Sequence, residues 1–385
     1  MIHLSSLEAL GQGALQYGGW FLIILTVLVF VHEFGHYIVA RWNRVRVDVF
    51  SIGFGPELFG RRDRAGTRWK FSAIPLGGYV KMFGDGDPTS GLPAAGFADL
   101  APAERAVSFH GKRLGQRAAI VAAGPAANFV FAVVVLAILF ATYGQPFTPA
   151  EIGQVQSGSA AEQGGMQPGD VITRIDGQPV QRFEDVQQIV RLNPATPMTF
   201  VVRRGGSDVT LHVTPKRSEL TDRFGNRYEI GLLGIAHRGM DYVKRDPATA
   251  VVLAADETWS LSVATLKAMW QIVIGMRSTD ELGGPLRIAQ MSGDVAEGGV
   301  VAVLWFMAVL SINLGLINLF PVPVLDGGHL LFYAAEALRG KPLGPRAQEY
   351  GFRIGLALVL TLMVFATRND LVHLGIWSWL KGLVT

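Results

Sequence analysis

Four apolar stretches dominate the sequence, at residues 19–40, 116–143, 300–320 and 351–366, of which the last is the shortest. A transmembrane helix needs about 20 predominantly apolar residues. Half of the 385 residues are hydrophobic and only 17% are charged, a composition too apolar for an ordinary soluble enzyme. The sequence therefore predicts a polytopic α-helical membrane protein with about four transmembrane helices.

Basic residues indicate which segments face the cytoplasm, because cytoplasmic loops carry an excess of lysine and arginine. They gather between the first two apolar stretches and again after the third, so we expect residues 144–297 to lie outside. The net charge of +3 gives no sign of a nucleic-acid partner, and the lack of cysteine excludes disulfides and thiolate metal sites. The basic residues are Arg41, Arg44, Arg46, Arg61, Arg62, Arg64, Arg68, Lys70, Lys81, Lys112, Arg113, Arg339, Lys341 and Arg346.

The first apolar stretch contains the sequence HEFGH, with His32, Glu33 and His36. A charged side chain at bilayer depth costs at least ~2.5–3.5 kcal/mol, so it indicates a function. Residues i and i+4 share one helix face, so both imidazoles can bind one zinc ion while Glu33 acts as general base on its water. At ~1.5 Å per residue, His36 lies about 7 Å and His32 about 13 Å inside Arg41, near the cytoplasmic side. Two histidines that hydrogen-bond within a helix bundle are the alternative.

A catalytic zinc site usually has three protein ligands, so a third ligand is needed. The third apolar stretch ends in NLFPVPVLDGGHL, residues 318–330, where Asp326 follows two prolines and precedes two glycines. Irregular backbone at membrane depth is tolerated where it lines a cavity. Asp326 falls on the same side of the membrane as His36, which makes it the best candidate. A plain surface turn before a cytoplasmic loop is the alternative.

These motifs resemble the site-2 protease family of intramembrane zinc metalloproteases. HEFGH and NLFPVPVLDGG carry the resemblance, and GFG (53–55), PLGGYVKM (75–82), GPAANF (124–129) and GGPLRIA (283–289) are similar to its bacterial, RseP-like branch. The resemblance implies one zinc ion per chain, bound by His32, His36 and Asp326, with Glu33 as catalytic base. It also implies substrate-binding roles for two asparagines, Asn318 and Asn128.

The same resemblance implies a location and a class of substrate. The protein would lie in the lipid bilayer of a bacterial inner membrane, with its active site near the cytoplasmic side. It would cut within the transmembrane segments of single-span proteins, such as anti-sigma factors already trimmed outside, or remnant signal peptides. Two other functions stay open: a membrane scaffold with a dead metal site, and a transporter with intramembrane ion ligands, although no inverted repeat is apparent.

Residues 45–83 are rich in valine, phenylalanine, glycine and tyrosine, and their local alternation predicts short strands. By resemblance these strands would form a membrane-associated, re-entrant β element whose edge binds an unwound substrate. A simple basic cytoplasmic loop is the alternative.

The external segment has the pattern of a small α+β domain. Strands, a short helix at 160–164, a PGD turn, an IDG hairpin, a second helix and a closing hairpin follow one another over residues 151–215. This pattern resembles a circularly permuted PDZ domain, in which the strand of Ile152, Gly153, Gln154 and Val155 would border the peptide groove. The family is thought to use such domains to exclude bulky substrates, and a generic β domain without a groove is the alternative.

The predicted organisation is an N-terminal membrane half (1–143), an inserted PDZ domain (150–217), a linker (218–297) and a C-terminal membrane half (298–385). Residues 247–275 have helical spacing but carry Asp256, Glu257 and Lys267, which favours an interfacial helix over a fifth span. Among the other histidines, His110, His237, His329 and His373 lack a partner at ligand spacing. Only His329, three residues after Asp326, is a candidate for the site.

Overall fold

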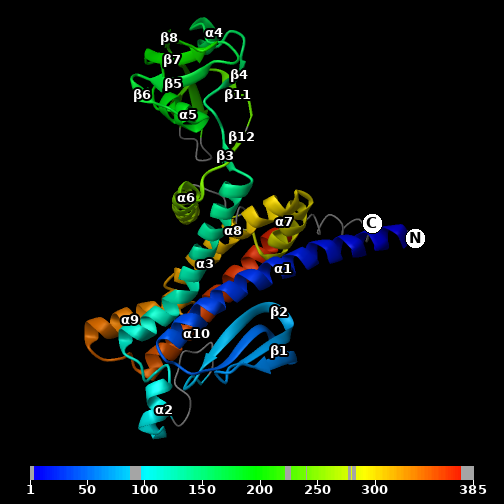
Figure 1. Ribbon diagram of the computed structural model, residues 1–385, viewed down its shortest axis with the longest axis vertical. Coiled ribbons are helices and arrows are strands. Elements are labelled where there is room, and N and C mark those ends of the chain that lie inside the picture. The colour runs from blue at the N-terminus through cyan, green and yellow to red at the C-terminus, as the bar shows by residue number, and fades with distance from the viewer. Residues whose placement is uncertain are drawn as a thin grey trace. The chain divides into compact units, whose positions relative to one another are not determined.

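The computed structural model describes residues 4–86, 97–221, 227–239, 241–275, 279 and 283–373. The chain forms two compact units (Figure 1). The first comprises Met1–Ala137, Val251–Trp270 and Ser278–Thr385, and the second comprises Ile138–Ala250 and Gln271–Arg277.

Within the described residues, four helices are long and apolar enough to cross a membrane, as the sequence predicts. They are α1 (Leu4–Trp42), α3 (Leu114–Thr142), α8 (Gly299–Leu319) and α10 (Pro345–His373). The fourth candidate span, Arg346–Val372, is longer than the predicted 351–366 because the helix continues through polar residues at both ends.

The first unit contains most of a further helix, α6 (Pro247–Val273), which matches the predicted helix at 247–275. It is not among the helices apolar enough to span a membrane, and its interfacial location stays a prediction. Three helices and one 3-10 helix were not predicted: α2 (Pro102–Val107), α7 (Pro285–Glu297), α9 (Asp326–Arg339) and η1 (Phe97–Asp99). Glycine pairs precede or open α7 and α9, and such pairs are typical of turns.

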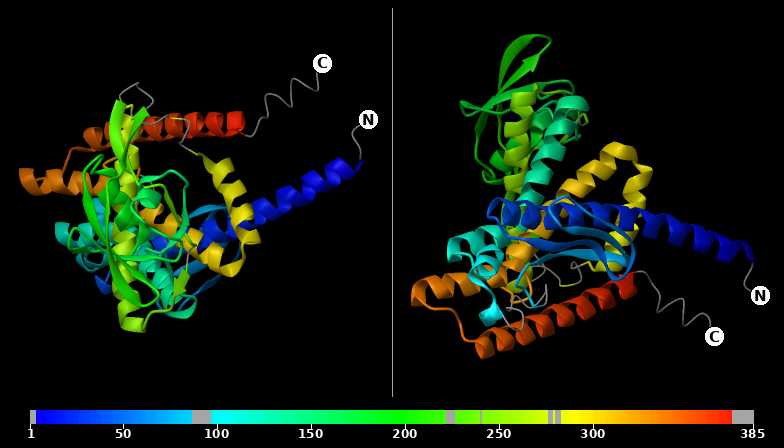
Figure 2. Two further views of the ribbon diagram at one scale, coloured as in Figure 1. Left: turned by 90° about the horizontal axis from the view of Figure 1, so that it is seen from above. Right: turned by 60° about the horizontal axis from the view of Figure 1, so that its bottom comes forward.

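A sheet formed by β1 (Val47–Arg62) and β2 (Arg68–Met82) packs beside α1, as the views of Figure 2 show. Each strand contributes two paired segments to this sheet. Residues 49–52 pair with 78–81 on one side and with 68–71 on the other. Residues 57–62 pair with 68–72. The pairing confirms the predicted strands and leaves residues 78–82 at one edge. Phe50 anchors the sheet in a core with Ala40 of α1 and Ile120 of α3.

The second unit is built on the strand order β6-β5-β7-β8, with β5 (Val171–Ile175), β6 (Gln178–Pro179), β7 (Met198–Arg204) and β8 (Ser207–Val213). The helices α4 (Ala160–Gln163) and α5 (Phe183–Arg191) match the two predicted helices. Three antiparallel pairs complete it: β4 (Ile152–Val155) with β11 (Ile235–His237), β9 (Lys216–Thr221) with β10 (Arg227–Leu232), and β3 (Gln145–Phe147) with β12 (Asp241–Val243).

The core of the second unit extends past the predicted boundary at residue 217. Leu233 is buried in that core and Ile235 packs against it. The linker prediction of 218–297 therefore begins too early, because β11 completes the fold by pairing with β4.

An ion pair ties the predicted PGD turn to β7. Two guanidinium nitrogens of Arg204 lie 2.7 Å from the two carboxylate oxygens of Asp170. Burial alone would raise the pKa of Asp170, but the hydrogen bonds from Arg204 and from the backbone N–H of Gln167 outweigh it and hold this pKa below its usual value.

Candidate metal centre

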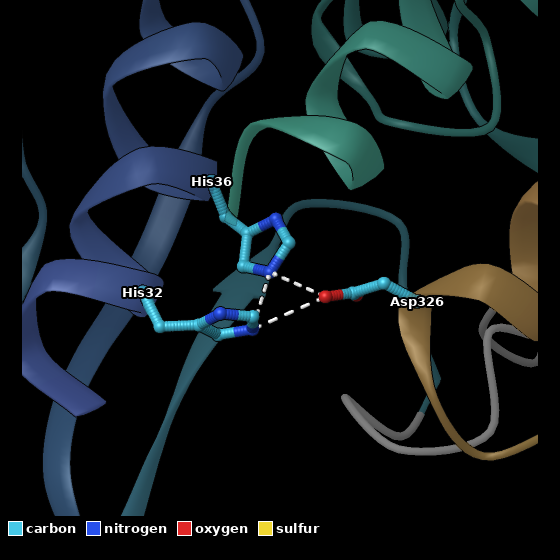
Figure 3. Close-up of side chains that lie close together, drawn as sticks. All are labelled: His32, His36 and Asp326. Carbon is cyan, nitrogen blue, oxygen red and sulfur yellow. Dashed lines mark hydrogen bonds and ion pairs between the residues drawn. The ribbon is translucent and has the colours of Figure 1, made fainter. Parts of the chain in front are cut away.

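His32 and His36 extend from one face of α1, one turn apart, toward the same point (Figure 3). Their Nε2 atoms lie 3.2 Å apart, and both residues are buried. The i, i+4 spacing produces this geometry directly.

Asp326, in the first turn of α9, completes the group. Its Oδ2 atom lies 3.1 Å from Nε2 of His32 and 3.5 Å from Nε2 of His36 (Figure 3). In the described part of the chain, this is the one group of three or more histidine, cysteine, aspartate or glutamate residues with metal-binding spacing.

The backbone between α8 and α9 brings Asp326 to this point. The helix α8 ends at Leu319, and Val324 has a φ of 125°, an unusual value for a β-branched residue. A Cβ on Gly327 would lie 2.3 Å from the carbonyl oxygens of Leu319 and Phe320, and a Cβ on Gly328 would lie 2.4 Å from that of Val322. The two glycines therefore let α9 begin in close contact with the preceding segment, rather than forming a plain surface turn.

The helix α3 covers the histidine rings from the other side. A Cβ on Gly124 would lie 2.3 Å from Nε2 of His36, and a Cβ on Gly35 would lie 2.3 Å from the carbonyl oxygen of Ala123. Glycine at both positions allows α1 and α3 to approach closely enough for α3 to line the site.

Hydrogen bonds hold the far nitrogen of each ring. Nδ1 of His36 donates to the carbonyl oxygen of Ile120 at 2.9 Å, and Nδ1 of His32 lies 3.1 Å from the side-chain nitrogen of Asn128. Asn128 is fully buried against the ring of His32. Asn128 is not among the residues that line the pocket beside the metal centre, so the structure does not support its predicted contact with substrate.

A pocket of about 250 Å³ opens beside the three residues. Glu33 and Asn318 both line it, together with residues 78–80 of the edge strand. A Cβ on Gly78 would lie 3.4 Å from Cγ of Glu33, so the edge strand passes next to this glutamate. The structure thus brings together five of the residues singled out in the sequence: His32, Glu33, His36, Asn318 and Asp326.

A second polar group lies at the pocket, and of its members only His329 was a candidate in the sequence. His329 and Asp85 line the pocket, and Nε2 of His110 lies 2.8 Å from Oδ1 of Asp85. Burial raises the pKa of the Asp85 carboxyl, although the nearby His110 opposes this shift. Asp85 and His110 are 25 residues apart on two loops, and no sequence pattern indicates that they meet.

Two observations indicate that His32, His36 and Asp326 can bind a zinc ion. Bonds of about 2.0–2.1 Å in a tetrahedron place ligand atoms roughly 3.3 Å apart, and the separations measured between His32, His36 and Asp326 are 3.1, 3.2 and 3.5 Å. Oδ2 of Asp326 is also buried without a hydrogen-bond partner among the described residues. Two imidazole nitrogens and one carboxylate oxygen are a donor set typical of catalytic zinc.

The groove of the second unit differs from the prediction. A pocket of about 950 Å³ lies between α5 and residues 233–236, which include the start of β11. Ile152 is fully buried, and its backbone N–H and carbonyl bond to residues 170 and 169. A Cβ on Gly153 would lie 2.5 Å from the backbone of Arg238. The assignment of Ile152 and Gly153 to the groove is therefore wrong, because β11 pairs with β4 and itself borders the pocket. The end of the predicted strand, Gln154 and Val155, does line the pocket.

The sequence matches the model of "Peptidase family M50" over residues 20–362. Two curated relatives bear the name "Putative zinc metalloprotease": one from Agrobacterium fabrum, 48% identical over 92% of this chain and 95% of its own length, and one from Rhizobium meliloti, 49% identical over 94% and 96%. Among solved structures, the PDZ domain of the SdrC-like protein from Listeria monocytogenes covers 24% of this chain and 88% of its own, with 15% identity and a TM-score of 0.19.

Proposed function

The chain belongs to peptidase family M50, whose relatives are named zinc metalloproteases, and we propose that it hydrolyses peptide bonds within the transmembrane segments of single-span membrane proteins. The observation that carries the proposal is the position of the metal centre. His32 and His36 belong to the candidate span Gln16–Trp42, and Asp326 joins them just beyond the end of another candidate span.

The depth of the site supports cleavage inside the bilayer. His36 and His32 precede Arg41 by five and nine residues in one continuous helix, so they lie about 7 and 13 Å along its axis from that basic residue. We assign Arg41 to the cytoplasmic interface by the excess of basic residues in the following loop. The scissile bond then lies within the membrane, nearer its cytoplasmic side.

The chemistry follows from the residues around the pocket. His32, His36 and Asp326 would hold the metal, and zinc bound there supplies Lewis-acid activation of water and of the scissile carbonyl. Glu33 lines the same pocket and accepts the proton of the attacking water. The protonated Glu33 then delivers that proton to the leaving amine, which restores the base.

Substrate binding uses the edge strand and Asn318. A helical substrate covers its own carbonyl groups, so the segment to be cut must unwind. Residues 78–80 present a strand at the pocket, and an extended segment can add to such an edge through main-chain hydrogen bonds. The amide of Asn318, which lines the same pocket as Glu33, holds the backbone of the same segment.

The second unit screens substrates from outside. Its topology and its groove between α5 and β11 suit a PDZ-type domain, which we place in the periplasm of a bacterial inner membrane by the distribution of basic residues. Substrates with large external parts would be excluded until another protease trims them. Anti-sigma factors trimmed in this way and remnant signal peptides are the substrate classes we propose.

Replacing Glu33 with glutamine tests the catalytic assignment. Glu33→Gln keeps the shape of the side chain and leaves the three metal-binding groups in place, so the purified variant should retain one zinc ion per chain. Cleavage of a single-span model substrate in detergent or liposomes should fall by about 10²–10⁴-fold, the usual contribution of a general base.

Asp326→Ala is the reference for loss of the metal, since it removes one of the three groups; both zinc and cleavage should be lost. A Glu33→Gln variant that still cuts at the native rate would contradict the role of Glu33. Native protein that holds zinc but cuts no transmembrane substrate would leave the scaffold or transporter function in place of proteolysis.

A further inference from the structure

We propose that Asn128 is a positioning residue for the metal centre: its side-chain oxygen accepts a hydrogen bond from Nδ1–H of His32 and so keeps Nε2 of that ring free for the metal. The inference rests on the proposed zinc site, and it replaces the substrate-binding role that the sequence predicts for Asn128.

The location of Asn128 places its amide against the ring of His32 and outside the lining of the pocket. The residue is fully buried in α3, and its amide lies 3.1 Å from Nδ1 of His32. The hydroxyl of Ser311, on α8, donates to the backbone carbonyl of Asn128 at 2.9 Å. This bond ties α8 to the turn of α3 that carries the amide, so the amide is held at the back of the ring.

The chemistry of imidazole requires a partner at that place. A neutral ring carries its proton on one nitrogen and a lone pair on the other. Nε2 of His32 faces Oδ2 of Asp326 at 3.1 Å and Nε2 of His36 at 3.2 Å, so Nε2 is the atom directed toward the metal. The proton must therefore lie on Nδ1, and the group beside Nδ1 must accept it.

His36 shows the same arrangement with a different acceptor. Its Nδ1 donates to the backbone carbonyl of Ile120 at 2.9 Å, an acceptor that no side-chain substitution removes. At His32 the corresponding acceptor is a side chain. Substituting Asn128 can therefore change the orientation of the His32 ring while both histidines stay in place.

The amide can meet this requirement by a half-turn about its last side-chain bond. The turn exchanges the oxygen and the nitrogen, which are similar in size, and brings Oδ1 against Nδ1 of His32. Oδ1 is buried and has no hydrogen-bond partner within the described residues, so the exchange breaks no hydrogen bond of that oxygen. A buried acceptor without a donor is costly, which gives the amide a reason to turn toward the Nδ1–H.

Two substitutions separate positioning from simple packing. Asn128→Leu keeps the approximate size of the side chain and removes the acceptor, whereas Asn128→Asp keeps an acceptor at the same place. Zinc affinity of the purified, full-length protein is measured by competition with a chelator of known affinity. We expect the leucine variant to bind zinc about 10–100-fold more weakly, the usual effect of losing such a partner, and the aspartate variant to stay within about threefold of the native protein.

Asn369→Leu is the matched control, because Asn369 is also buried and its amide donates to a backbone carbonyl far along the chain, that of Thr279. It should lower the thermal unfolding midpoint and leave zinc affinity unchanged. Native zinc affinity in Asn128→Leu overturns the proposal. A tenfold or greater loss of zinc affinity in Asn128→Asp also overturns it, because a residue that only packs would tolerate a leucine better than a buried charge. If the leucine variant fails to fold, the aspartate variant decides alone.

The variant Asp326→Ala separates failure of the Asn128 proposal from failure of the proposed zinc site. If the native protein binds zinc and Asp326→Ala does not, the metal site stands and the Asn128 variants test positioning only. If Asp326→Ala binds zinc as the native protein does, the proposed zinc site itself is wrong.

Discussion

Gly124 illustrates how one missing methyl group decides the geometry of the metal centre. Its Cα faces the two histidine rings at the point where α3 crosses α1, and a Cβ there would lie 2.3 Å from Nε2 of His36 and 2.9 Å from Cε1 of His32. The ring of His36 cannot move aside freely, because its Nδ1 is hydrogen-bonded to the carbonyl oxygen of Ile120.

We therefore expect Gly124→Ala to displace the nitrogen of His36 that faces the metal. Zinc affinity should fall at least about tenfold, as for other changes that disturb ligand orientation, and the overpacked site should lose about 1–3 kcal/mol of stability. Chelator competition and thermal unfolding of the purified protein measure the two effects.

Gly115→Ala is the control on the same helix, since a Cβ at Gly115 meets no atom within 4 Å. It should leave zinc affinity unchanged. Equal zinc affinity in Gly124→Ala and Gly115→Ala would show that the close approach of α3 has no part in holding the rings.

At the same scale, the sequence identified the residues whose roles depend on local spacing. His32 and His36 share one helix face and Glu33 flanks it, so their meeting follows from helix geometry alone. Asn128 was assigned by resemblance, and the sequence contains no signal that its amide lies behind a histidine. Asp85, His110 and His329 were not predicted as a group, because three separate segments bring them to the pocket.

At the scale of elements, α10 holds the start of α7 through one carboxylate. Asp370 is buried and accepts hydrogen bonds from the backbone N–H groups of Gly284, Leu286 and Arg287 at 2.8, 3.0 and 3.2 Å. These donors belong to the first turn of α7 and its N-cap, where a helix has no partners of its own. A Cβ on Gly284 would lie 2.6 Å from Asp370, which explains a glycine in the GGPLRIA motif.

Removing this carboxylate should destabilise the first unit. Asp370→Ala leaves three backbone donors without their acceptor, at an expected cost of about 1–3 kcal/mol. Because Ile288 and Val295 of α7 pack in the core with Ile24 and Leu28 of α1, we expect a lower thermal unfolding midpoint for the unit as a whole.

Thr361→Ala provides the comparison, because Thr361 is exposed on α10 and its hydroxyl bonds to its own helix at Ala357. Its unfolding midpoint should stay near that of the native protein, because surface changes usually alter the free energy of unfolding by no more than about 0.5 kcal/mol. If Asp370→Ala unfolds no earlier than Thr361→Ala, the link from α10 to α7 does not stabilise the protein.

Elements with a clear hydrophobic pattern in the sequence were predicted. Arrangements that depend on pairing between strands far apart in the sequence were not. The four long helices and the strands of residues 45–83 follow from local pattern. The order of those strands does not, since residues 49–52 pair on both sides with segments far along the chain. The position of β11 beside β4 is of the same kind: the two are about 80 residues apart, and this distance is why the groove was assigned to Ile152 and Gly153.

At the scale of the whole molecule, the metal centre joins residues almost three hundred positions apart. The sequence predicted Asp326 on the same side of the membrane as His36, which made a meeting possible but did not determine it. The backbone of residues 319–328 and the unpredicted helix α9 complete the approach, through two glycines that pack against carbonyl oxygens. Convergence of these three side chains is the central claim, because the base, the edge strand and the positioning amide all act through it.

Anomalous X-ray diffraction from crystals of the zinc-loaded protein, recorded on both sides of the zinc absorption edge, tests this claim most directly. The account predicts one anomalous peak per chain, about 2.0–2.2 Å from Nε2 of His32, Nε2 of His36 and a carboxylate oxygen of Asp326. A peak bound elsewhere, or one that touches the two histidines while the carboxylate of Asp326 points away, would contradict it.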